Sequence, residues 1–334
     1  MDFPFIIFVF FEKVFPGRVA GPSDALIRIW EVCKRVLFSV EPRRALCVLH
    51  TAAFSLLFIF LSPSVYAEPF LARDLHESVV RVPVVVKDAF GERHLSLETT
   101  VYKPDGDGPF PLLILSHGTP PFGKRRYMER TRYLEQSREF IKLGFVVAIP
   151  MRRGYGNSDG NPVMEKCTDA PHHEIGLGEA KDLLATVEYM KREPYVDGTR
   201  IVLAGQSGGG FASIACSGIG FEGLVAVVNF AGGRGSMQNA GVCSENELIS
   251  AYGKYGKTSR VPTLWLYTQN DLYFPPRLAK EMYEAFVKPG GQAKMVLLPP
   301  FEHNGHFLFS SNNGIPIWLP EVKNFLKPLL PIRD

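Results

Sequence analysis

The chain has 334 residues, of which 46% are hydrophobic, and 37 Lys and Arg against 34 Asp and Glu leave a net charge of +3. This length can bury a large core in one or two domains. The small, dispersed net charge argues against a nucleic-acid partner and against binding to an anionic membrane surface. We therefore expect a small-molecule or polymer-linked substrate. Glycine and proline are scattered along the chain without a tandem period, as in a compact globular protein.

The first 67 residues differ in character from the rest. An arginine pair precedes the apolar run ALCVLHTAAFSLLFIFL, and Val65 and Ala67 then place small residues at the spacing that a signal peptidase recognises. We therefore expect a leader over 1–67 with a signal-peptide-like segment over 43–67, cleavage near Ala67, and export to the periplasm or medium. The alternative is an uncleaved leader that anchors the protein in the membrane. The role of residues 1–40 and the true start of the protein stay open.

Three cysteines follow the expected cleavage site: Cys167, Cys216 and Cys243. In an oxidising compartment, an odd count leaves one thiol unpaired. Cys216 lies in a predicted helix of small residues, so we expect it to be a buried thiol. Cys167 and Cys243 lie in polar, loop-like stretches, and we predict a disulfide between them that stabilises by about 4 kcal/mol in the chain-entropy model.

From Glu77 onward, short runs rich in β-branched residues alternate with helical patterns. This alternation predicts an α/β fold, with a mostly parallel central sheet of about eight strands and helices on both faces. The first two runs should pair antiparallel at the sheet edge. The expected strands lie within 78–87, 94–102, 111–118, 144–154, 200–207, 223–233, 262–271 and 293–300.

No Pro- or Ser-rich linker divides residues 68–334, so we expect one catalytic domain there. Apolar residues from Ala180 to Met190 fall on one helical face, and Pro194 should end that helix. The stretches 156–174 and 233–247 are expected as loops above the sheet. Loops at the carboxyl ends of parallel strands are where such folds build pockets.

The stretch RIVLAGQSGGGFAS places Ser207 in a GxSxG pattern, where an apolar strand stops and a small-residue helix starts. Glycines two residues before and two after the serine permit a sharp strand-to-helix turn, because side chains there would clash. Such a turn lifts the hydroxyl above the sheet edge. Alone, the pattern is only moderately specific, and its value comes from the flanking strand and helix signals.

A serine hydroxyl is a poor nucleophile, so it needs a base and a carboxylate that orients the base. In this kind of fold the expected chain order is Ser, then Asp or Glu, then His. Between Ser207 and His306 the chain has a single aspartate, Asp271, at the end of a predicted strand. Two histidines follow Ser207, and we favour His306 as the base because Gly305 frees its loop to turn inward. A contribution from His303 stays open.

The tetrahedral intermediate of such a reaction needs hydrogen-bond donors for its oxyanion. One expected donor is the backbone N–H of Gly208, directly after the nucleophile. The other is a backbone N–H in the SHGTPP stretch, from Thr119 or, second in preference, from Gly118. His117 comes too early in the chain to be the base, and we expect it to shape this loop.

Residues 68–334 resemble the dienelactone hydrolase-like branch of the α/β-hydrolase superfamily over most of their length. The resemblance rests on LSHG, RRGYGNSDG, GQSGGG, LWLYTQNDLYFPP and PPFEHNGHFLF. It implies that Ser207 is the nucleophile, Asp271 the acid and His306 the base. The namesake enzymes carry a cysteine nucleophile, so the serine here favours the serine esterases and the acyl-peptidase-like members.

Three functions therefore stay under consideration. The preferred one is an exported serine hydrolase that cleaves a carboxylic ester through an acyl-enzyme on Ser207. The alternatives are a serine peptidase or amidase of the acyl-aminopeptidase type, and a catalytically dead binding protein on the same fold.

No cofactor and no metal are expected. The stretch GIGFEG matches a dinucleotide fingerprint, but it runs from helix into strand, the reverse of what such a site needs. CTDAPHHE offers possible zinc ligands, yet no second ligand cluster at zinc spacing accompanies it. GKRRYMERTR, residues 123–132, could draw a substrate carboxylate toward the site, but interleaved charges at a helix start more often form a solvated face.

Overall fold

The computed structural model describes residues 71–333, apart from 89–90, 121–123, 164–166 and 238–240. Leu71–Asp334 forms one compact unit. The expected leader and its cleavage site lie outside the described residues. Across the described ranges, the structure has no helix with the length and apolar character needed to cross a bilayer.

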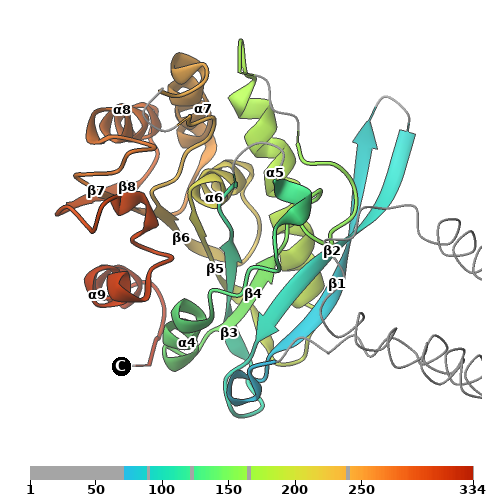
Figure 1. Ribbon diagram of the computed structural model, residues 1–334. Helices are drawn as coiled ribbons and strands as arrows, with labels where there is room; N and C mark the ends of the chain where they lie inside the picture. The colour runs from blue at the N-terminus through green and yellow to red at the C-terminus, as the bar shows by residue number, and fades with distance from the viewer. Residues whose placement is uncertain (1–70, 89–90, 121–123, 164–166, 238–240, 334) are drawn as a thin grey trace, which may run out of the picture. The chain divides into compact units, whose positions relative to one another are not determined.

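The described residues form one sheet of eight strands in the order β1-β2-β4-β3-β5-β6-β7-β8 (Figure 1). β1 pairs antiparallel with β2, and β2 with β4, whereas all other neighbours are parallel. The predicted sheet, with its antiparallel pair at the edge, is therefore confirmed. The strands are β1 (Ser78–Asp88), β2 (Gly91–Tyr102), β3 (Phe110–Ser116), β4 (Val146–Pro150), β5 (Val196–Gln206), β6 (Leu224–Phe230), β7 (Thr263–Thr268) and β8 (Ala293–Leu298).

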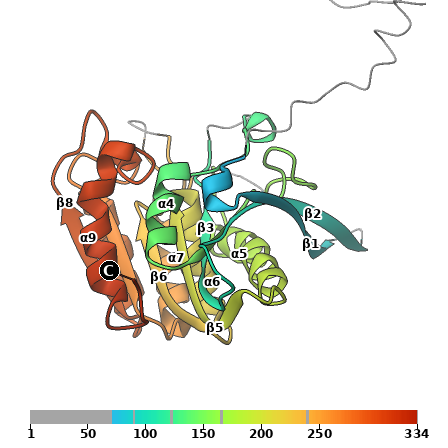
Figure 2. The ribbon, with the colours of Figure 1, turned by 90° about the horizontal axis from the view of Figure 1, so that it is seen from below.

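Helices cover both faces of this sheet, because successive side chains of a buried strand point to opposite faces. On β3, Leu112 and Ile114 pack in one core with α5 to α8, whereas Leu113 and Leu115 pack in a second core with α4 and α9. Figures 1 and 2 show the two helical layers. The helices are α4 (Leu134–Lys142), α5 (His172–Met190), α6 (Gly208–Ile219), α7 (Glu245–Thr258), α8 (Pro276–Val287) and α9 (Ile315–Leu326).

Three helix boundaries differ from the sequence prediction. α5 begins at His172, inside the stretch that we expected to be a loop, and it ends at Met190 rather than at Pro194. The residues between Met190 and β5 form turns that reverse the chain into the sheet. α7 likewise begins at Glu245, inside the second expected loop. Polar residues at these helix starts hide the helical period from sequence analysis.

A disulfide joins Cys167 to Cys243, as expected. It ties the loop before α5 to the loop before α7, both above the carboxyl edge of the sheet. Cys216 is a free thiol buried in α6, also as expected, and burial raises the pKa of this thiol.

Candidate active site

Ser207 lies on the sharp turn between β5 and α6, with φ +54° and ψ −122°. Residues other than glycine rarely adopt this strained backbone conformation, and such strain is typical of functional positions. A Cβ added at Gly205 would lie 2.3 Å from the carbonyl carbon of Gly209, and one at Gly209 would lie 2.1 Å from the Ser116 carbonyl oxygen. Glycine is therefore required on both sides of the serine, as the motif predicts.

Asp271 and His306 form a buried hydrogen-bonded pair. One carboxylate oxygen of Asp271 accepts the backbone N–H groups of Tyr273 and Phe274 at 2.8 and 2.9 Å. The other oxygen lies 3.0 Å from His306 Nδ1. Because a carboxylate only accepts, Nδ1 carries the proton, and Nε2 is left as the basic nitrogen of the ring.

Three contacts fix the His306 ring and its loop. The ring stacks on Tyr273 with centroids 4.3 Å apart. The side chain of Asn304 accepts the His306 backbone N–H at 3.1 Å, and the side-chain amide of Gln206 donates to the His306 carbonyl oxygen at 2.9 Å. His303, the alternative base, is exposed at the surface.

Gln206 is a site residue that sequence analysis missed, although its place directly before Ser207 was a usable signal. The side-chain oxygen of Gln206 accepts a hydrogen bond from the Tyr133 hydroxyl at 3.1 Å. Burial raises the pKa of Tyr133 to about 12, and a hydrogen bond from the Gly118 backbone partly opposes this shift. Two hydrogen bonds thus link the residue before α4 to the end of β5, and the end of β5 to the loop after β8.

This geometry separates the two candidate donors after β3. A hydrogen bond from the Gly118 backbone lowers the pKa of Tyr133, whereas Thr119 lines the cavity that holds Ser207. A Cβ added at Gly208 would lie 2.3 Å from Thr119 Oγ1, so the two remaining donor residues are close neighbours. The arrangement favours the Gly208 and Thr119 amides as the oxyanion donors.

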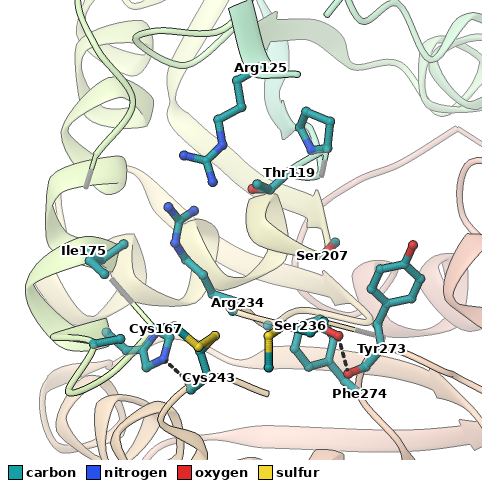
Figure 3. A pocket seen from close by; sticks show the side chains of 16 residues that line it. Thr119, Arg125, Cys167, Ile175, Ser207, Arg234, Ser236, Cys243, Tyr273 and Phe274 are labelled. Carbon is teal, nitrogen blue, oxygen red and sulfur yellow. Dashed lines mark hydrogen bonds between the residues drawn. A yellow bond between two sulfur atoms is a disulfide. The ribbon is translucent and has the colours of Figure 1, made fainter. Parts of the chain in front are cut away.

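A cavity of about 550 Å³ adjoins these residues. Ser207, Thr119, Tyr273 and Phe274 line it (Figure 3), and His306 packs against both aromatic rings. Among the described residues, no hydrogen bond ends on the Ser207 hydroxyl. Catalytic hydrogen bonds often form or tighten only when substrate binds, so we expect the Ser207 hydroxyl to donate to His306 Nε2 in the substrate complex.

The residues that sequence analysis weighed as zinc ligands have other roles. Cys167 is in the disulfide, His172 bonds the Cys243 carbonyl oxygen at 2.8 Å, and the His173 ring lies 3.2 Å from Glu174. Within the described ranges, no group of three or more His, Cys, Asp or Glu side chains is placed to hold a metal ion.

The family profile described as the prolyl oligopeptidase family matches residues 132–331, which is more than half of the chain. The chain belongs to the prolyl oligopeptidase family. The match covers all three members of the Ser207, Asp271 and His306 set. This member of the family is therefore a serine hydrolase.

Solved structures share the fold of this prolyl oligopeptidase family member. A protein described as a dienelactone hydrolase from Klebsiella pneumoniae matches at 17% identity over 75% of this chain and 99% of its own, with a TM-score of 0.50. An esterase from Pyrococcus furiosus matches at 16% identity over 80% and 96%, with a TM-score of 0.55. An acylaminoacyl peptidase from Pyrococcus horikoshii matches at 18% identity over 77% of this chain but only 43% of its own, with a TM-score of 0.56. The expected α/β-hydrolase fold is confirmed.

Proposed function

We propose that this serine hydrolase cleaves a carboxylic ester through an acyl-enzyme on Ser207. The observation that carries the proposal is the buried hydrogen bond between Asp271 and His306. The His306 imidazole also packs against Tyr273, which lines the cavity of Ser207. That bond orients the ring and stabilises the imidazolium that forms during the reaction. A catalytically dead binding protein would have no use for such an arrangement.

The proposed reaction begins when His306 Nε2 takes the Ser207 proton as the hydroxyl oxygen attacks the ester carbonyl carbon. The oxyanion accepts hydrogen bonds from the backbone N–H groups of Gly208 and Thr119. Each such donor typically contributes a factor of about 10² to 10³ in rate. His306 then returns the proton to the leaving alcohol. Water attacks the acyl-enzyme by the same route and releases the acid.

We prefer an ester substrate to a peptide because of how much of each similar structure this chain matches. The proteins described as an esterase and as a dienelactone hydrolase match this chain over nearly their whole length. The peptide alternative is favoured by the family match and by the likeness to an acylaminoacyl peptidase, of which the chain spans less than half.

A panel of nitrophenyl esters graded by acyl length, measured beside aminoacyl nitroanilides, tests this choice. We expect ester hydrolysis at kcat/KM values well above those for the anilides, and loss of both activities in the Ser207→Ala variant. Turnover of aminoacyl nitroanilides without turnover of the esters would overturn the ester proposal and favour the peptidase.

We also propose that the protein is exported, with cleavage near Ala67. The Cys167–Cys243 disulfide supports this, because disulfides persist mainly in oxidising compartments. N-terminal sequencing of the protein from its native host is the test. A mature N-terminus at Met1, together with free thiols at both cysteines, would contradict export.

A further inference from the structure

One buried arginine contacts the segment that carries the Thr119 amide, residues 116–119, which we call the oxyanion loop. Arg152 lies two residues after the end of β4 and is only 1% exposed. Its Nη1 donates to the Ser116 hydroxyl oxygen at 2.7 Å and to the His117 carbonyl oxygen at 2.5 Å. Its Nη2 donates to Thr119 Oγ1 at 3.4 Å. One rigid, planar group therefore contacts three residues of the oxyanion loop.

The main chain of Arg152 fixes the same loop through the ring of His117. The Arg152 backbone N–H donates to His117 Nε2 at 3.0 Å, so this nitrogen carries no proton. Nδ1 therefore carries the proton and donates to the Gly118 carbonyl oxygen at 2.7 Å. Burial and the positive charge of Arg152 hold the pKa of His117 well below its usual value. The ring is therefore neutral at neutral pH and keeps this tautomer.

The hydrogen bond from His117 sets the direction of the Thr119 N–H. The Gly118 carbonyl and the Thr119 N–H belong to one planar trans peptide unit and point in opposite directions. Tyr155 adds support, since its hydroxyl lies 3.3 Å from Thr119 Oγ1 and its ring packs edge to face on His117. The Arg152 guanidinium lies over the Tyr155 ring, 5.1 Å from its centroid. Arg152 and Tyr155 thus hold the oxyanion loop together.

The Arg152 guanidinium can stay charged in the interior because Glu179 lies beside it. The Glu179 carboxylate, which also accepts a hydrogen bond from Arg234, lies 3.8 Å from Arg152 Nε. A buried charge without such a partner is strongly disfavoured. A Cβ added at Gly208 would lie 3.5 Å from Arg152 Nη2. The guanidinium is therefore close to both proposed donor residues, Gly208 and Thr119.

The segment that follows the oxyanion loop packs on the same part of the chain. We expected residues 123–132 to form a solvated face, and Arg125 departs from this expectation. It lies in the short helix η2 (Arg125–Tyr127), is only 7% exposed and lines the cavity (Figure 3). Its guanidinium lies over the Tyr155 ring, 5.6 Å from the centroid, and its carbonyl oxygen accepts the Gly156 N–H at 3.0 Å. The stretch after β4 thus contacts the chain on both sides of residue 120.

We propose that Arg152 is a positioning residue for the oxyanion hole, which holds the Thr119 N–H toward the oxyanion formed when Ser207 attacks. This role rests on the proposed hydrolysis by Ser207. Arg152 is not among the described residues that line the cavity, so it acts through the oxyanion loop and not on the substrate. Its loss should therefore weaken the transition state and leave substrate binding nearly unchanged.

A pair of esters that differ in one atom tests the proposal. Nitrophenyl butyrate is compared with its thiono counterpart, in which sulfur replaces the carbonyl oxygen. Sulfur accepts hydrogen bonds only weakly, so the oxyanion hole favours the oxygen ester. The readout is the ratio of kcat/KM for the oxygen ester to that for the thiono ester. A general loss of alignment between Ser207 and His306 slows both esters alike and leaves this ratio unchanged.

We expect Arg152→Met to lower kcat by about 10- to 100-fold with little change in KM, because the misplaced donor acts in the transition state. The oxygen-to-thiono ratio should fall by about tenfold, part of the usual effect of one oxyanion donor. Arg152→Lys should restore part of the ratio, since it keeps the charge but not the planar fork. An unchanged ratio in folded Arg152→Met would overturn the positioning role.

The matched control is Arg153→Met, at the next position in the chain. Arg153 donates to the buried carboxylate of Asp182 on α5 at 2.6 Å, rather than to the oxyanion loop. This variant should lose stability and keep the ratio, and thermal unfolding shows which variants are folded. Equal falls of the ratio in the two variants would show a general structural effect and overturn the proposal. If Arg152→Met does not fold, an unchanged ratio in folded Arg152→Lys would overturn it instead.

Inactivation by paraoxon and parathion separates this proposal from the proposed ester hydrolysis. In both reactions the Ser207 oxygen bonds to phosphorus, nitrophenolate leaves, and His306 takes the serine proton. The two compounds differ only in P=O against P=S, so the ratio of their inactivation rates also reports the oxyanion hole. Mass spectrometry of the Ser207 peptide follows the reaction.

The ratio of inactivation by paraoxon to that by parathion should fall in Arg152→Met and stay unchanged in Arg153→Met. Such a fall without ester turnover would count against the ester proposal alone. An equal ratio in wild type and Arg152→Met would overturn the positioning role even if esters are hydrolysed. A wild type that neither hydrolyses esters nor is phosphorylated at Ser207 would overturn both proposals.

Discussion

The side-chain amide of Gln206 donates to the main-chain carbonyl oxygen of His306, 100 residues later in the chain, at 2.9 Å. Gln206 directly precedes Ser207, so the residue beside the proposed nucleophile holds the loop that carries the proposed base. Tyr133 fixes the orientation of the amide by donating to its oxygen. The position of the base relative to the nucleophile therefore depends in part on this buried amide.

Replacing Gln206 by Leu should lower kcat on a nitrophenyl ester by about 10- to 100-fold, because a small displacement of the base misaligns proton transfer. KM should change little, since Gln206 does not line the cavity. The matched control is Gln136→Leu, which removes a bond at 3.0 Å from another buried glutamine to the Phe309 carbonyl oxygen in the same segment. Equal losses of kcat in the two variants would mean that Gln206 only stabilises the loop.

The Gly209→Ala variant should be destabilised by about 1 to 3 kcal/mol, the usual cost of overpacking. Its added methyl group would meet the Ser116 backbone carbonyl oxygen at 2.1 Å, so the backbone would have to shift. Chemical denaturation measures the loss. Gly253→Ala on α7, where the nearest atom is 3.3 Å away, serves as the control and should lose less. A fully stable Gly209→Ala protein would contradict the close approach at the turn.

Removing the disulfide with Cys167→Ser and Cys243→Ser together should lower the free energy of unfolding by about 4 kcal/mol in the chain-entropy model. The bridge joins residues that are 76 positions apart. Its removal therefore frees a long loop in the unfolded chain. Denaturation with and without reductant measures this. The Cys216→Ala variant should keep the sensitivity of wild type to reductant. A double variant as stable as oxidised wild type would contradict the prediction.

Glu77 should make stability depend on acid pH. Burial works against its ionised form, but hydrogen bonds from Arg132, the Ala72 backbone and Arg130 outweigh burial and lower its pKa. A lowered folded pKa contributes stability above the unfolded value of about 4.3, and this contribution is lost as pH falls through the folded pKa. Glu77→Gln should therefore cost about 3 kcal/mol at pH 7, the typical effect of breaking a buried ion pair.

The difference in unfolding free energy between wild type and Glu77→Gln should shrink as pH falls below about 4. Denaturation curves between pH 2 and pH 7 provide the measurement. A difference that stays constant down to pH 2 would show that the charge on Glu77 does not matter.

The strands and the turn at Ser207 were predictable because their signals are local. Alternating apolar runs set the strands, and the glycines around Ser207 mark a turn that only small residues allow. The order of Asp271 and His306 after the serine follows from the topology of this sheet, in which later strands add side by side at the same edge.

The remaining site residues were not predictable because their roles come from contacts between distant segments. Gln206 meets His306, and Tyr133 meets Gln206 across 73 residues. Arg125 was expected in solvent, since charge spacing cannot show that a segment after β3 turns inward over a cavity. The start of α5 at His172 was hidden for a similar reason, because polar residues open the helix.

Labelling with a fluorophosphonate, followed by mass spectrometry of the modified peptide, tests the central claim most directly. We predict that wild type is modified at Ser207, that Ser207→Ala is not, and that His306→Asn reacts far more slowly because the base is lost. Thermal unfolding of each variant shows that the protein is folded. Absence of labelling in folded wild type, or labelling of a residue other than Ser207, would contradict the account.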